Sequence, residues 1–250
     1  MARILREAAL MEHFEELRIR ILIALGFWGI GSVVAWIYGD WILKLLRQPL
    51  IPTQGKVQVI TTGLTEQLFI KFSVALWGGF FIALPFILHQ IWLFIEPALT
   101  RSERRYAIPF VLGTLGSFLL GNLFCFKVIL PSAIPFLLSL LGESSGVVSF
   151  LNLSNYIGNV LTYLVTFGIL FQLPILSFML TKLGLVRPGL LIAWRRYALV
   201  VILIVSAVIT PTSDPFNLAL MALPIYLLYE ISIWVSLWSV PRNAEQNPSI

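Results

Sequence analysis

The sequence predicts an all-α, polytopic membrane protein with six transmembrane helices, both termini in the cytoplasm and the last two helices short. Of the 250 residues, 58% are hydrophobic and only 12% are charged, whereas a soluble domain carries about 25% charged residues. The apolar residues form continuous runs and do not alternate with polar ones, which favours helices over the strands of a membrane barrel. We therefore expect a single bundle over residues 1–240 and a disordered cytoplasmic tail over residues 241–250.

The expected spans follow from the lengths of the apolar runs, because a crossing helix needs about 20 mostly apolar residues. They are residues 19–38, 68–95, 106–130, 156–180, 197–209 and 216–235. The fifth is short, since the apolar run from Ala198 to Ile209 covers roughly 18 Å of a hydrocarbon core about 30 Å thick. The sixth is also expected to be short, because Glu230 interrupts its apolar run.

Basic residues predict the orientation, because cytoplasmic loops carry an excess of Lys and Arg. With the N-terminus inside, 12 of the 17 basic residues fall in cytoplasmic segments or at their edges. The net charge of +5 therefore reflects topology, and the scatter of these residues over short loops excludes nucleic acid as a partner.

Two outer segments carry features of their own. In WILKLLRQPL, Trp41, Leu45 and Leu46 are expected to form the apolar face of a short interfacial helix. In TPTSDPFN, Asp214 is expected to cap the sixth helix by accepting hydrogen bonds from its free backbone N–H groups.

Carboxylates gather in the N-terminal segment, on the predicted cytoplasmic side. Its acidic face consists of Glu12, Glu15 and Glu16, and its apolar face of Leu10, Phe14, Leu17 and Ile21. One interpretation is a solvated helix face, in which Arg20 supports Glu16 from four residues away. The other is a binding site for a cationic peptide.

The loop FIEPALTRSERR, residues 94–105, is a second acidic segment on the same side. Pro97 is expected to end the second span. Glu96 and Glu103 are acidic where topology alone favours Lys and Arg. Glu103 either pairs with one of the arginines that follow it, or it binds a guanidinium from another molecule. Arginine suits the second role, because its planar guanidinium donates two hydrogen bonds to one carboxylate.

Polar groups within the spans are few. Gln172 precedes Pro174 in an apolar run, so its amide needs partners inside the bundle or in a cavity. Glu230 must face protein or the membrane interface. Because Cys125 is the only cysteine and the two histidines, His13 and His89, have no ligand-like partners, we expect no metal, no cofactor, no catalytic residue and no enzymatic activity.

Several segments in one order resemble the TatC family, which forms the core of twin-arginine protein translocases. They are EHFEELRIR, FIEPALTRSERR, FGILFQLPI and TPTSDPFNLALMALPIYLLYE, and the resemblance covers about residues 10–235. It implies a receptor for folded precursor proteins that bear a signal peptide with two adjacent arginines. It further implies export driven by the proton-motive force, without a bound cofactor.

The resemblance also implies roles for individual residues. Glu16 and Glu103 match the signal-binding carboxylates, and Arg18, Phe94 and Pro97 fall in the same two motifs. The positions implied for contacts with partner subunits, or for structure, are Pro49, Gln172, Asp214 and Glu230. Many family members have Glu where this chain has Gln172, so the resemblance supports hydrogen bonding there better than a protonation role.

The implied partners are twin-arginine signal peptides, single-pass subunits of the TatA and TatB type, further copies of the chain, and the lipid bilayer. The implied location is the bacterial cytoplasmic membrane or the thylakoid. The alternative function is a secondary transporter of a small solute or ion. Such transporters usually contain internal repeats and a polar site at the bilayer midplane, and the sequence contains no visible repeat.

Overall fold

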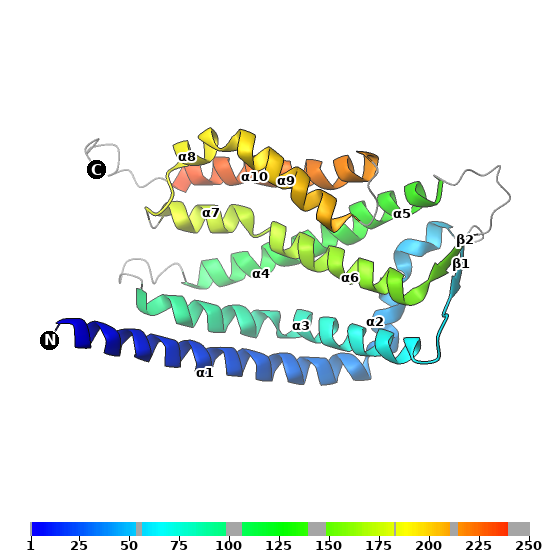
Figure 1. Ribbon diagram of the computed structural model, residues 1–250, viewed down its shortest axis with the longest axis horizontal. Helices are drawn as coiled ribbons and strands as arrows, with labels where there is room; N and C mark the ends of the chain where they lie inside the picture. The colour runs from blue at the N-terminus through cyan, green and yellow to red at the C-terminus, as the bar shows by residue number, and fades with distance from the viewer. Residues whose placement is uncertain are drawn as a thin grey trace. The chain divides into compact units, whose positions relative to one another are not determined.

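The computed structural model describes residues 2–53, 57–98, 107–139, 149–182, 184–210 and 215–239 (Figure 1). The helices are α1 (Ala2–Ile37), α2 (Gly39–Leu46), α3 (Glu66–Ile95), α4 (Ala107–Phe124), α5 (Leu130–Ser139), α6 (Leu153–Leu170), α7 (Leu173–Lys182), α8 (Pro188–Ala193), α9 (Arg195–Ile209) and α10 (Pro215–Ser239). Short 3₁₀ turns form η1 (Gln48–Thr53) and η2 (Glu96–Ala98), and a π-helical turn, η4 (Cys125–Ile129), joins α4 to α5. The all-α membrane class is confirmed.

Five helical segments of the described chain are long and apolar enough to cross a membrane. They are His13–Ile37, Glu66–Phe94, Pro109–Phe136, Leu153–Lys182 and Pro215–Ser239. The predicted fifth span corresponds to α9, whose 15 residues extend about 22 Å and fall short of the core thickness of about 30 Å. The short fifth helix is therefore present, and the count of six spans stays a prediction.

Helix α10 is longer than the sequence predicted. It has 25 residues and continues to Ser239, so the expectation of a short last helix was wrong. Glu230 does not interrupt it, because this carboxylate accepts hydrogen bonds from Arg195 at 2.7 Å and from the Tyr226 hydroxyl at 3.0 Å. A paired carboxylate near the end of a span costs far less than an isolated one.

The chain divides into two compact units, each described here by itself. Unit 1 comprises Met1–Gln48, Gln58–Leu115 and Phe150–Gly158, and unit 2 comprises Pro49–Val57, Gly116–Ser149 and Asn159–Ile250. The prediction of one bundle over residues 1–240 stays a prediction, and the expected tail, residues 241–250, lies outside the described residues.

Unit 1 is built on the pair α1 and α3, which lie side by side (Figure 1). The indole N–H of Trp28 donates to the carbonyl of Leu76 at 2.8 Å, and Phe27 stacks on Phe86 with ring centroids 4.6 Å apart. The two backbones approach closely at a glycine of α3, since a methyl group added at Gly79 would lie 2.4 Å from the backbone of Ser32. Small residues let membrane helices pack this closely.

The outer end of unit 1 contains structure that the sequence did not predict. Strands β1 (Val57–Ile60) and β2 (Ser149–Asn152) form a two-stranded sheet. One carboxylate ties the neighbouring segments together, because Glu66 accepts hydrogen bonds from the backbone N–H of Thr62 at 2.6 Å and of Ser154 at 3.2 Å. A short helix is present where the sequence predicted one, as α2, with Trp41 exposed and Leu46 buried. Its place at the membrane interface stays a prediction.

Unit 2 is held by small polar side chains between α7 and α10, which lie side by side (Figure 1). Ser177 donates to the carbonyl of Ser232 at 2.8 Å, and the hydroxyls of Thr181 and Ser236 share a hydrogen bond of 2.5 Å. All four side chains are buried. Hydroxyl side chains at helix interfaces let the helices approach and also satisfy one another.

Replacing Gly31 with Ala is expected to lower the melting temperature of the purified protein by a few degrees. The added methyl group would lie 2.6 Å from the carbonyl oxygen of Gly79, and overpacking typically costs about 1–3 kcal/mol. The matched control is Gly29→Ala on the same helix, where the methyl group meets nothing within 4 Å. The control should keep or slightly raise the melting temperature, since Ala favours a helix by about 1 kcal/mol over Gly. Equal melting temperatures for the two variants would contradict close α1–α3 packing.

Candidate functional site

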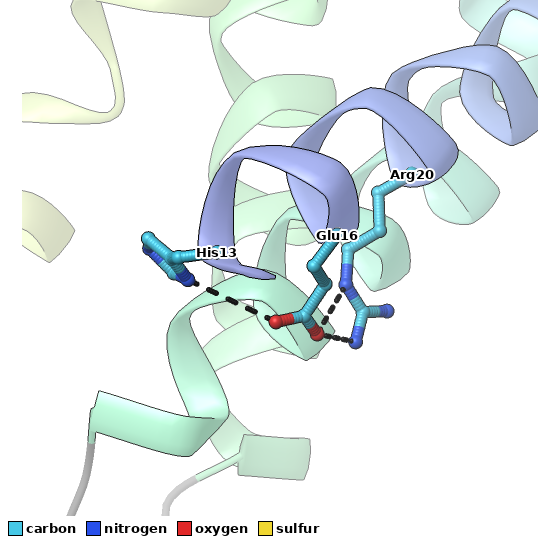
Figure 2. Close-up of polar contacts among 3 residues, drawn as sticks. All are labelled: His13, Glu16 and Arg20. Atoms are coloured by element: carbon cyan, nitrogen blue, oxygen red, sulfur yellow. Dashed lines mark hydrogen bonds and ion pairs between the residues drawn. The ribbon is translucent and has the colours of Figure 1, made fainter. Parts of the chain in front are cut away.

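The candidate site begins with Glu16, which projects from α1 together with two neighbours on the same helix (Figure 2). Arg20 contacts one carboxylate oxygen through Nε at 3.0 Å and also through Nη2. His13 Nδ1 lies 3.8 Å from the other oxygen. The spacings of three and four residues place all three side chains on one helix face. The contact between Arg20 and Glu16 proposed from the sequence is therefore present.

The side chains that make the Glu16 contacts are partly exposed to solvent. The side chains of Glu16, Arg20 and His13 are 31%, 20% and 49% exposed, respectively. Ion pairs of this spacing on a helix surface contribute only about 0.3–0.5 kcal/mol. An incoming guanidinium that brings better geometry can therefore replace Arg20 at little cost.

His13 also connects this face of α1 to the end of α3, which lies in the same unit. Its ring stacks on Phe94, with centroids 4.3 Å apart and an angle of 17° between the planes. Helix α3 ends at Ile95, and the turn Glu96–Ala98 follows it. Pro97 in this turn is exposed. Phe94 of the second predicted motif is thus adjacent to the N-terminal motif.

The structure does not bring every predicted site residue to this place. Glu103 and Asp214 lie outside the described residues. Arg18 is exposed on α1, but at about 100° per residue it lies on a different helix face from Glu16. The sequence reasoning missed His13 as a neighbour of Glu16, although its spacing of three residues was a usable signal.

Gln172 lies at the break between α6 and α7. Its Nε2 donates to the carbonyl of Gly168, near the end of α6, at 3.1 Å. Pro174 has no N–H to continue the helical ladder, and the nearby carbonyl of Phe171 accepts a hydrogen bond of 2.5 Å from the hydroxyl of Ser117. The geometry therefore includes the structural hydrogen bond expected for Gln172.

The other predicted positions, Pro49 and Glu230, belong to unit 2, whereas Glu16 belongs to unit 1. Pro49 is buried in η1. Glu230 of α10 pairs with Arg195 of α9, both in unit 2. No group of three potential metal ligands occurs in the part of the chain that the structure describes. The chemistry of the Glu16 face is thus that of an acceptor for cations.

Comparisons with known proteins agree with the residue patterns. The family model of the Sec-independent protein translocase protein (TatC) matches residues 12–224. A TatC protein of Deinococcus radiodurans is 44% identical over 236 residues, which cover 93% of this chain and 87% of that protein. A TatC protein of Aquifex aeolicus is 39% identical, over 94% of this chain and 98% of that protein.

A solved structure shows the same fold. The crystal structure of the twin-arginine translocase receptor TatC matches with a TM-score of 0.82 at 39% identity, and it covers 91% of this chain and 99% of that chain. The fold, the motifs and the sequence identity over almost the whole length agree, and the chain belongs to the TatC family of Sec-independent protein translocase proteins.

Proposed function

We propose that this chain is the receptor subunit of a twin-arginine protein translocase, which binds the signal peptides of folded precursors and starts their export by the proton-motive force. Membership of the TatC family and similarity to the solved receptor support this function. They also favour it over the alternative of a solute or ion transporter. The observation that carries the proposal is the partly exposed carboxylate of Glu16, paired within its own helix with Arg20, in the segment predicted to face the cytoplasm.

The proposed site uses Glu16 and Glu103 as acceptors for the two guanidiniums of the signal peptide. A guanidinium binds a carboxylate through two parallel hydrogen bonds, which is stronger than the single-point contact of an ammonium. Two arginines are therefore preferred over two lysines. Phe94 is proposed to provide an apolar border beside Glu16, because His13 stacks on Phe94 and lies next to Glu16. Pro97, in the turn after α3, is proposed to belong to the same binding surface. Arg18 lies on another face of α1 and is proposed to contribute to the electrostatic potential around the binding site.

The remaining proposals concern partners and location. Single-pass subunits of the TatA and TatB type, together with further copies of this chain, are proposed to assemble around the bundle. The residues proposed to contact them, or to support the fold, are Gln172, Pro49, Asp214 and Glu230. The proposed location of this multi-pass protein is the bacterial cytoplasmic membrane, with the thylakoid as the alternative. No bound cofactor takes part in the proposed mechanism.

Replacing Glu16 with Gln is expected to weaken binding of a twin-arginine signal peptide about tenfold, because charge-assisted hydrogen bonds are lost. The measurement is peptide affinity for the purified protein in lipid nanodiscs. The matched control is Glu15→Gln, which removes the same charge from an adjacent, exposed position. Equal losses for both variants would mean that a general negative field attracts the peptide and that Glu16 has no specific role.

Replacing Arg20 with Gln is expected to strengthen the same binding about twofold, because it removes the intrahelical competitor for Glu16. The effect should vanish when Glu16 is already Gln. Weaker binding by the single Arg20→Gln variant would contradict competition and would show that Arg20 holds Glu16 in its binding orientation.

A further inference from the structure

Unit 2 contains an apolar groove. It is formed by α7, α8, α9 and α10 together with the end of α6, and it has a volume of about 350 Å³. Every lining residue is apolar or aromatic, and Leu173, Leu190, Val201, Val205 and Ile225 are among them. Because the helices around it belong to a membrane bundle, lipid rather than water is the medium available to fill it.

The groove begins at two aromatic side chains at the start of α9. Trp194 and Tyr197 both line it, their ring centroids lie 6.0 Å apart, and they are 57% and 52% exposed. Trp and Tyr concentrate at the level of lipid headgroups. From Trp194 to Val205 the helix rises about 16 Å, which is roughly half of a hydrocarbon core about 30 Å thick. The groove thus has the depth of one leaflet.

A guanidinium lies on Tyr197, one of the aromatic residues that line this groove. The Cζ atom of Arg196 is 4.7 Å from the ring centroid of Tyr197, and its Nη2 donates to the Tyr197 hydroxyl at 2.9 Å. The neighbouring Arg195, by contrast, forms an ion pair with Glu230 at 2.7 Å. Among the described residues Arg196 has no carboxylate partner. Its charge is therefore available to an anion at the headgroup level.

We propose that this groove binds an anionic phospholipid of the adjacent leaflet, with one acyl chain between α7 and α9 and the phosphate on Arg196. An apolar groove with the depth of one leaflet fits the acyl chain of the lipid. An exposed guanidinium held on an aromatic ring fits its phosphate. Basic pockets between membrane helices on the cytoplasmic side recognise anionic headgroups in this way, and Arg is well suited because its fork binds phosphate with two hydrogen bonds. A zwitterionic lipid of the same chain length lacks the net charge that Arg196 attracts.

Native mass spectrometry of the full chain tests the proposal, with equal amounts of phosphatidylglycerol and phosphatidylcholine of identical acyl chains. The wild-type chain should retain phosphatidylglycerol in preference. Arg196→Gln should lower that retention about fivefold. Arg195→Gln is the control, since it removes one positive charge at the next position without touching the guanidinium on Tyr197, and it should keep the preference. Because this variant also removes the partner of Glu230, its fold is checked by circular dichroism and melting temperature.

A second variant tests the groove itself. Ala198 lines it, so Ala198→Phe should fill the space and remove the retained lipid while Arg196 is intact. Should this variant fail to fold, as judged by its circular dichroism and melting temperature, the two arginine variants still decide the question.

Three results would overturn the proposal. Equal losses for Arg195→Gln and Arg196→Gln would indicate general surface attraction. No preference of the wild-type chain for phosphatidylglycerol would exclude an anionic headgroup site. A photoreactive residue at position 201 that labels a protein and no phospholipid in native membranes would assign the groove to a partner helix. None of these results depends on signal-peptide binding, so the proposed receptor function is tested separately.

Discussion

The lack of water inside a bilayer is the constraint on which this structure depends. A polar group in the hydrocarbon region must find its partner within the protein, since an unsatisfied one costs several kcal/mol. In unit 2, short side chains between helices provide several such partners. Ser177 and Thr181 of α7 bond to α10, and the carbonyl of Phe171, near the break between α6 and α7, accepts from Ser117. The same contacts join the helices of this unit, so they satisfy polar groups and pack the helices at once.

Two ion pairs near the ends of the spans follow from the same constraint. The pair of Arg195 and Glu230 joins two helices of unit 2 and lets α10 continue past a carboxylate. The pair of Arg20 and Glu16 lies within one helix. Because this second pair does not join two helices, it can be exchanged for an external ligand without loss of the fold, which supports the proposed receptor role of Glu16.

Much of the fold could be predicted from the sequence, because long apolar runs leave few alternatives in a membrane. The runs containing α1, α3, α4 and α6 were found, as was the shortness of α9. The end of α10 was not, because the partner of Glu230 is 35 residues away in the chain and no local pattern indicates it. Strands β1 and β2 were missed because each has only four residues and their pairing depends on contacts between distant segments.

The candidate site was predictable in part for similar reasons. Local spacing identified the contact of Arg20 with Glu16, since both lie on one helix. The stacking of His13 on Phe94 joins residues 81 positions apart, so only the packing of α1 on α3 reveals it. Resemblance to a family, and no physical rule, connected Glu16 with Glu103.

The central claim is that the face around Glu16 and Glu103 receives a pair of guanidiniums, and photo-crosslinking from position 103 in native membranes tests it most directly. The account predicts a crosslink to a precursor with a twin-arginine signal and a marked loss of that crosslink when both arginines are replaced by lysines. Absence of a crosslink to either precursor, in a protein that inserts normally, would contradict the account and leave Glu103 as the partner of a neighbouring arginine.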